Sequence, residues 1–207
     1  MTFQSLYAKT STPTTAPAAA QALLPDWPAT FEGDACPQAL PEPFVLKVSG
    51  LVTTPLELTL PDLSTLGDGV YEGRLVSVDG WSYQSRWDGV LLKRLIEKIQ
   101  PLPAARYLNQ TDASGRSEWL DLSAVRNSNA LLCTGERGEA LNPLYGGPLR
   151  LMLFGSYSYK GFGQLVGLEF SETPCPSAAL ARGYSEDGRI IPGDYYAFDQ
   201  KSMRRVG

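Results

Sequence analysis

Hydrophobic residues follow two different periods along this chain, and each period predicts a different kind of element. From Phe44 onward the chain is dense in residues that favour β-strands. Leu and Ile residues recur at helical spacing within residues 90–99, which predicts an amphipathic helix that ends before Pro101. Glu136 to Glu139 has the composition of a turn. The further predicted core strands cover residues 70–78, 106–112, 130–134, 149–154 and 164–170.

The two ends of the chain differ in composition from this central part. Residues 1–41 are rich in Thr, Ala and Pro and predict an extended N-terminal arm with little regular structure. Residues 173–207 are polar and interrupted by Gly and Pro, but three aromatic residues within 193–198 predict a C-terminal tail packed on the domain. We therefore expect one domain over residues 42–172, of the α+β class, with a mixed, partly barrel-like sheet and short outer helices.

Length and charge narrow the possible functions. A chain of 207 residues buries about 70% of its unfolded surface, and a hydrophobic fraction of 43% is ordinary for a globular protein. The net charge of -4 and the absence of any basic run argue against nucleic-acid binding. No apolar run approaches the roughly 20 residues that a membrane span needs, so we expect no membrane span.

The sequence contains no histidine, which removes both the commonest general base and the commonest metal ligand. Ser-His-Asp triads, zincin sites and facial-triad iron sites are therefore excluded, and acid–base chemistry would fall to carboxylates, Lys, Tyr or Cys. Cys36, Cys133 and Cys175 are widely spaced, so they predict neither a metal knuckle nor a disulfide framework. We expect ordinary buried or free thiols.

The segment Ser77-Val78-Asp79-Gly80-Trp81-Ser82 resembles a cofactor motif, Cys-Val-Glu-Gly-Trp-Ser. That motif ends a strand in the molybdopterin-binding oxidoreductases of the sulfite oxidase and protein-methionine-sulfoxide reductase type. Three further segments resemble the same family in the same order: residues 87–92, 145–151 and 155–169. The resemblance covers residues 42–172 and implies the sulfite-oxidase-type molybdopterin-binding fold.

In that family the cysteine thiolate binds molybdenum, and the residue at its position here is Ser77. A soft thiolate suits a redox metal better than a neutral hydroxyl does. Carrying over the family's cofactor contacts gives Thr111, Tyr145, Arg150 and Gly163, with Gly161 and Phe162 before the last. Thr111 and Arg150 keep the family's residue type. Ser77, Tyr145 and Gly163 replace cysteine, asparagine or histidine, and lysine.

These changes predict that the cofactor is lost. Each charge-assisted hydrogen bond to a pyrophosphate contributes about 1.5–3 kcal/mol, so glycine in place of the family's lysine weakens that contact. We expect no cofactor and no metal, and a small anionic ligand held in the ancestral pocket by Arg150, Lys160 and Thr111. Ser77 and Asp79 are the candidates for non-redox catalysis.

Two other functions stay open. A working molybdopterin-dependent oxidoreductase of a sulfoxide- or sulfite-like oxo substrate would have its metal bound by Ser77 or by no protein side chain. A structural or partner-binding domain would instead have its pocket filled by Tyr145. The same residues also have structural interpretations: Ser77 as a core residue, Arg150 and Lys160 in ion pairs, Asp79 in a turn, and Trp81, Trp87, Tyr157 and Tyr159 in packing.

The N-terminus has no basic start followed by an apolar core and no twin-arginine pair. The chain as given therefore predicts a cytoplasmic location. Because many relatives are exported, a periplasmic location is the alternative if an export signal preceded this sequence. Nothing in the sequence identifies a protein partner.

Overall fold

The computed structural model describes residues 22–23, 25, 39–40, 42–78 and 80–191, and the backbone of two further strands, residues 194–197 and 202–205. Most of the predicted N-terminal arm lies outside these ranges, and so do Cys36 and Asp79. Within them, no helix has the length and apolar character needed to cross a membrane.

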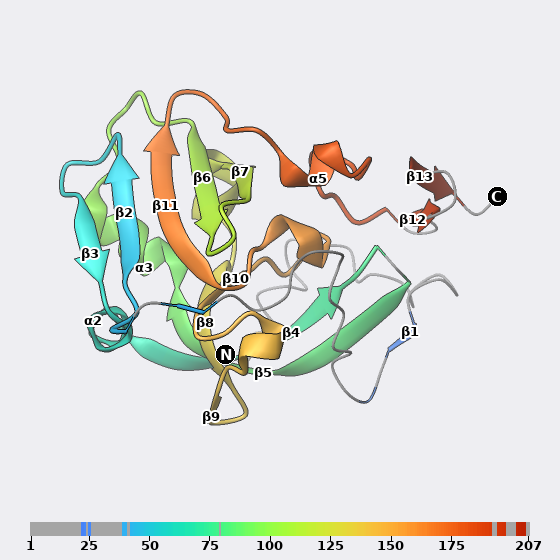
Figure 1. Ribbon diagram of the computed structural model, residues 1–207, viewed down its shortest axis with the longest axis horizontal. Coiled ribbons are helices and arrows are strands. Elements are labelled where there is room, and N and C mark those ends of the chain that lie inside the picture. The colour runs from blue at the N-terminus through green and yellow to red at the C-terminus, as the bar shows by residue number, and fades with distance from the viewer. Residues whose placement is uncertain are drawn as a thin grey trace.

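Two open β-sheets form the body of the domain (Figure 1). The first contains β1 (Ala22–Leu23), β4 (Asp68–Val76), β5 (Trp81–Leu91), β8 (Leu131–Glu136), β9 (Glu139–Ala140) and β10 (Arg150–Met152). The second has the order β3-β2-β11-β6-β7, formed by β2 (Leu46–Gly50), β3 (Leu56–Leu58), β6 (Tyr107–Asp112), β7 (Ser117–Asp121) and β11 (Leu165–Ser171). β12 (Asp194–Ala197) and β13 (Ser202–Arg205) pair only with each other. Parallel pairing of β2 with β11 makes the second sheet mixed.

The helices are short. They are α2 (Leu60–Ser64), α3 (Leu92–Ile99), α4 (Leu122–Arg126) and α5 (Ala178–Ala181), with 3₁₀ turns η1 (Pro143–Tyr145) and η2 (Ser158–Lys160). α3 is the predicted amphipathic helix, and its buried residues are Leu92, Leu95, Ile96 and Ile99. It begins later than predicted because β5 continues to Leu91, whose extended backbone precedes the first turn. The α+β class is confirmed, and the single predicted sheet is divided into two.

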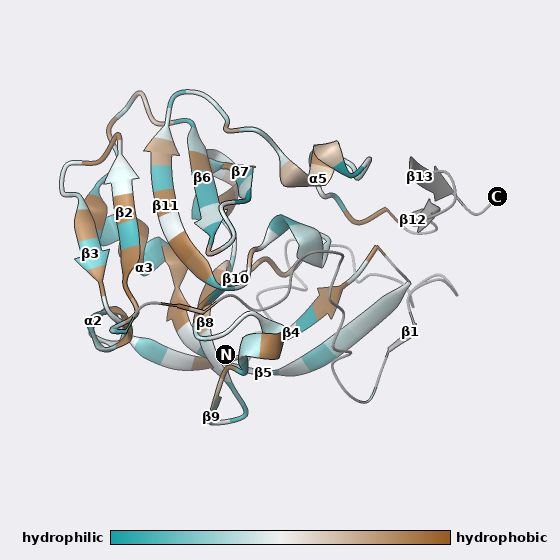
Figure 2. Ribbon diagram, in the orientation of Figure 1, coloured by the Kyte–Doolittle hydropathy of each residue, from teal (hydrophilic) through white to brown (hydrophobic). Residues whose placement is uncertain are grey.

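Burial separates the side chains of these elements into distinct clusters. The largest lies along the second sheet and α3, and Figure 2 shows apolar and polar bands alternating along β6 and β11. A second cluster, here called the sheet core, lies on one face of the first sheet. Its residues are Leu75, Tyr83, Trp87, Leu131, Cys133, Leu141, Met152 and Phe154.

The long β4–β5 hairpin fixes the position of the resembling motif. β4 and β5 pair in antiparallel register from Asp68 opposite Val90 to Val76 opposite Ser82. Ser77 follows the last paired residue, so the motif forms the turn that closes the hairpin. The Ser77 N–H donates to the carbonyl of Trp81 (2.8 Å) across this turn.

Candidate functional site

Ser77, which the motif resemblance places at the position of the metal ligand, is completely buried. Val78 beside it is 1% exposed. The turn that follows needs a left-handed residue, and Gly80 supplies it with φ +90°. Asp79 lies outside the described residues, so its predicted catalytic role stays a prediction. A ligand can reach the Ser77 hydroxyl only after the residues around it move.

Aromatic side chains cover this end of the hairpin. Tyr157, which forms a bridge with Val76, packs with Val78, Tyr159 and Tyr184 in one buried cluster. The rings of Tyr157 and Tyr159 are stacked with centroids 5.9 Å apart, and Tyr159 and Tyr184 lie 4.7 Å apart. The Tyr159 hydroxyl donates to the carbonyl of Ser185 (2.6 Å). The packing interpretation of these tyrosines is therefore confirmed, and we call them the tyrosine cluster.

Arg150 opens β10 directly opposite Cys133 in β8. Its guanidinium donates from Nη1 to the carbonyl of Tyr145 (3.3 Å) and from Nη2 to the carbonyl of Ser158 (3.5 Å). Both distances lie beyond the usual 2.7–3.2 Å range for N–H···O bonds. Tyr145 itself is half-buried at the end of η1, where it packs against the sheet core. Arg150 is half-buried as a residue, and its Nε atom is buried.

Two glycines pack backbone to backbone beside Arg150. A Cβ added to Gly163 would lie 2.4 Å from the Cα of Gly146 and 3.3 Å from Arg150 Nη1. The Gln164 N–H donates to the Gly146 carbonyl (2.6 Å), which fastens the two segments together. The family's lysine therefore has no room at position 163 with this backbone. The change at Gly163 is part of a local rearrangement and not the loss of one charge.

Gly161 and Phe162 have structural roles in the same segment. A Cβ on Gly161 would lie 2.1 Å from the carbonyl oxygen of Leu151, so only glycine fits there. Phe162 is buried in the largest hydrophobic cluster, and its N–H donates to the Gln110 side chain (2.9 Å). Neither residue offers a polar group to a ligand in this arrangement.

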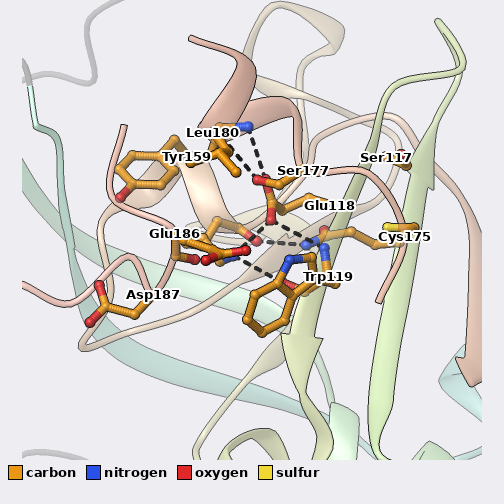
Figure 3. Close-up of polar contacts among 12 residues, drawn as sticks. Ser117, Glu118, Trp119, Tyr159, Cys175, Ser177, Leu180, Glu186 and Asp187 are labelled. Atoms are coloured by element: carbon orange, nitrogen blue, oxygen red, sulfur yellow. Dashed lines mark hydrogen bonds and ion pairs between the residues drawn. The ribbon is translucent and has the colours of Figure 1, made fainter. Parts of the chain in front are cut away.

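The ammonium group of Lys160 donates to three protein acceptors, which belong to Glu118, Trp119 and Glu186. Figure 3 shows how these three residues lie around one another. Its side chain is 3% exposed, and Nζ donates to Glu118 Oε1 (2.7 Å) and to the carbonyls of Trp119 (2.9 Å) and Glu186 (2.8 Å). A lysine has three N–H donors, and all three are used. The other Glu118 oxygen accepts from Ser177 Oγ (2.8 Å). In this arrangement Lys160 has no donor left for a ligand, which agrees with its ion-pair interpretation, and the predicted ligand contact stays a prediction.

Thr111 follows Gln110, whose side chain bonds to the Lys160 carbonyl (2.6 Å) and the Phe162 N–H (2.9 Å). Thr111 belongs to β6 in the second sheet, where it pairs with Gly167 and Ser117. Arg150 belongs to the first sheet, and no described hydrogen bond joins it to Thr111. The residues predicted to share one ligand thus divide into Arg150 beside the glycines, Thr111 in the other sheet, and Lys160 in a closed ion pair.

The donor set does not suit the cysteine-ligated metal of the family. Burial raises the pKa of Cys133 to about 12, and its thiol donates to the Gly135 carbonyl (3.2 Å), so Cys133 does not supply a thiolate in place of Ser77. Among the described residues no group of three or more Cys, Asp or Glu side chains is placed to hold a metal ion. With Ser77 buried and the donors of Lys160 occupied, neither residue offers a contact to the metal or the pyrophosphate in this arrangement.

The sequence pattern did not single out Arg74 of the β4–β5 hairpin and gave Trp81 only a packing role. Arg74 in β4 donates from Nη2 to Ser82 Oγ (2.6 Å), whereas its Nε is buried without an acceptor in the described structure. Trp81 Nε1 is likewise a buried donor without a described acceptor. The one available signal was that Arg74 is a charged residue within a predicted strand, between Gly73 and Leu75. No such signal existed for Trp81, because an indole in a strand is ordinarily a packing residue.

Comparison with known proteins defines the class to which this fold and site belong. The family described as oxidoreductase molybdopterin binding domain matches residues 34–179, so the chain belongs to that family. The catalytic subunit MsrP of protein-methionine-sulfoxide reductase from Ralstonia nicotianae is 26% identical over 189 residues, which cover 81% of this chain and 56% of that protein. The chain thus spans little more than half the length of that relative.

A solved structure supports the same fold. The sulfane dehydrogenase SoxCD from Paracoccus pantotrophus superposes with a TM-score of 0.63 at 20% identity, over 69% of this chain and 42% of that one. The predicted sulfite-oxidase-type molybdopterin-binding fold is therefore confirmed, together with the predicted family.

Proposed function

We propose that this chain is a member of the molybdopterin-binding oxidoreductase family that does not use cysteine-ligated molybdenum and binds a small anionic ligand at Arg150. Two parts of the ancestral pocket carry the proposal. One is Ser77, at the position assigned to the metal ligand, and the other is Arg150, the first residue of β10.

The position of the metal ligand supports the first half of the proposal. Ser77 is completely buried, and Val78 beside it belongs to the tyrosine cluster. A neutral hydroxyl in that place is a poor substitute for a thiolate, and its proton is hard to remove in an apolar setting. The non-redox catalytic roles considered for Ser77 and Asp79 would need the same cover to open.

The observation that carries the second half is the position of Arg150 between two glycines. The added Cβ positions of Gly146 and Gly163 lie 3.2 and 3.3 Å from Arg150 Nη1, so glycine at both leaves the guanidinium approachable. Its bonds to the carbonyls of Tyr145 and Ser158 are long at 3.3 and 3.5 Å. A phosphate or carboxylate would replace them with shorter, charge-assisted and bidentate bonds.

Calorimetric titration with inorganic phosphate tests this proposal. We expect Arg150→Lys, which keeps the charge but loses the two-donor edge, to weaken binding at least tenfold, or by about 1.4 kcal/mol. Arg94→Lys is the matched control, because Arg94 is an exposed α3 residue that pairs with Glu97 (3.3 Å). Equal phosphate affinity in wild type, Arg150→Lys and Arg94→Lys would contradict the anion site.

An active molybdopterin-dependent oxidoreductase is the second candidate, and family membership over residues 34–179 favours it. Its substrate would be a sulfoxide- or sulfite-like oxo compound, and the Ser77 end of the hairpin would have to open to admit the cofactor. Stoichiometric molybdenum in the purified protein decides in favour of this candidate.

A structural or partner-binding domain is the third candidate. The complete burial of Ser77 and the occupied donors of Lys160 favour it, because they fill two parts of the ancestral pocket with protein atoms. Tyr145 packed against the sheet core points the same way. Absence of both molybdenum and phosphate binding would leave this candidate as the function.

A further inference from the structure

The β4–β5 hairpin carries a cation whose charge no described residue balances. Arg74 lies in β4 opposite Gln84 of β5. Its guanidinium donates one hydrogen bond, from Nη2 to Ser82 Oγ (2.6 Å). The ion pairs formed by the described residues do not include Arg74. A half-buried guanidinium in a folded protein is ordinarily paired, so this arrangement requires an explanation.

The Nε atom of Arg74 adds a second, independent observation. It is a buried donor that has no acceptor in the described structure. Burial also lowers the pKa of the guanidinium below its ordinary value. A buried N–H group that has lost its water and gained no acceptor is rare in native proteins, and an unobserved ligand is one of its physical explanations.

The geometry of the guanidinium selects the class of ligand. Nε and one Nη lie on the same edge of the planar group and donate in parallel, which matches two oxygens of a phosphate or carboxylate. Ser82 is completely buried and its Oγ holds Nη2, so the orientation of this edge is fixed before a ligand arrives. We propose that Arg74, oriented by Ser82, binds a small oxyanion.

This oxyanion site is separate from the one proposed at Arg150. Leu75 points into the sheet core, so its neighbour Arg74 points to the opposite face of the sheet. Arg150 lies directly across from Cys133, which belongs to the sheet core, so Arg150 is on the core face. The two arginines are on opposite faces of one sheet, and binding at either does not require the other.

Nuclear magnetic resonance of the full chain tests the site directly, through the Nε–H resonances of its arginines. Inorganic phosphate is titrated through the millimolar range at an ionic strength held constant with chloride, which keeps general screening unchanged. We expect the Arg74 Nε–H resonance, assigned by its loss in Arg74→Lys, to shift and saturate. The resonance of Arg86, an exposed residue of the same hairpin, serves as the internal control and stays in place.

Affinity measurements complete the test. We expect Arg74→Gln to weaken phosphate binding at the Arg74 site at least tenfold, and Arg86→Gln to change it less than twofold. If Arg74→Gln does not fold, Arg74→Lys replaces it, because it keeps the charge and removes the Nε donor. An Arg74 resonance that does not respond to phosphate or acetate overturns the proposal. The Arg150 resonance in the same spectra reports the other site, so failure of one proposal is distinguishable from failure of the other.

Discussion

Lys160 and Arg150 both lie in segments that resemble the family, but their hydrogen bonds differ. Lys160 makes three hydrogen bonds of 2.7 to 2.9 Å, one of them to the carboxylate of Glu118. Arg150 makes bonds of 3.3 and 3.5 Å to two backbone carbonyls. All three donors of Lys160 are used within the fold at ordinary distances, whereas the two described carbonyl bonds of Arg150 are longer than usual. Sequence resemblance alone assigned both residues to one ligand.

Lys160 also helps to hold another segment of the chain in place. The ammonium of Lys160 and the carboxylate of Glu118 together bind the backbone of the C-terminal segment at Ala179 and Glu186. That segment contributes Tyr184 to the tyrosine cluster beside Val78. The Lys160–Glu118 ion pair therefore holds in place the segment that covers the Ser77 end of the hairpin.

The largest expected effect is the loss of the Lys160 ion pair. Lys160→Met leaves Glu118 buried and unpaired, and we expect it to lower the free energy of unfolding by about 3–5 kcal/mol. Lys47→Met is the control, because Lys47 and Glu57 are exposed and 4.0 Å apart, and we expect a change within about 0.5 kcal/mol. Urea unfolding of both variants measures the difference. Similar stability of the two variants would refute the contrast drawn for Lys160.

The contact between the glycines beside Arg150 comes next. Gly146→Ala places a Cβ 2.5 Å from Gly163 in a backbone with φ +91°, and we expect a cost of roughly 3 kcal/mol from strain and overpacking. Gly115→Ala is the matched control, since Gly115 has φ +83° but open space around it, and its cost is about 1 kcal/mol. Thermal unfolding of the two variants isolates the steric part. Equal losses would show that the glycines do not need to touch.

A smaller effect is expected in the pH dependence of stability, through Asp187, which follows the Glu186 carbonyl bound by Lys160. Hydrogen bonds from Ser185 Oγ (2.6 Å) and the Arg189 N–H (3.0 Å) hold the pKa of Asp187 below its ordinary value. The stability from Asp187 is therefore complete above about pH 4 and is lost as the pH falls through the lowered pKa. We expect Asp187→Asn to be less stable than wild type at neutral pH and to converge with it in acid. Unfolding curves that stay parallel down to low pH would contradict this assignment.

The smallest expected effect belongs to the metal position. We expect Ser77→Cys, expressed in a host that makes molybdenum cofactor, to acquire no molybdenum, because Lys160 is paired with Glu118 and position 163 has no room for the family's lysine. Elemental analysis of the purified variant measures this, and wild type prepared alongside is the control. Uptake of molybdenum by this single change would show that only the ligand is missing.

Features set by residues close together in the sequence could be predicted, whereas features set by contacts between distant residues could not. The helix at Leu92 to Ile99 and the core strands follow from local periodicity, and the structure contains them. The division into two sheets was not predictable, because pairing joins β-strands that are distant along the chain. The same limit applies to the ion pair of Lys160, because its partner Glu118 lies in β7 and nothing near Lys160 in the sequence indicates it.

The site was predicted in part for the same physical reason. Resemblance located the motif at Ser77 and the start of β10 at Arg150, because both are short local patterns. The contact of Gly146 with Gly163 depends on two loops meeting, and the buried Nε of Arg74 depends on what surrounds it. Neither can be inferred from residue types, so the structure was needed to show how the surroundings of these cations differ.

The most direct test of the central claim is the molybdenum content of the wild-type chain. The full-length protein is purified from a host competent in molybdenum-cofactor synthesis, and metal per chain is measured by elemental analysis. Because Ser77 is buried and neutral and Lys160 is fully bonded, we predict molybdenum far below one atom per chain. About one molybdenum per chain would contradict the account and establish the cofactor-dependent alternative.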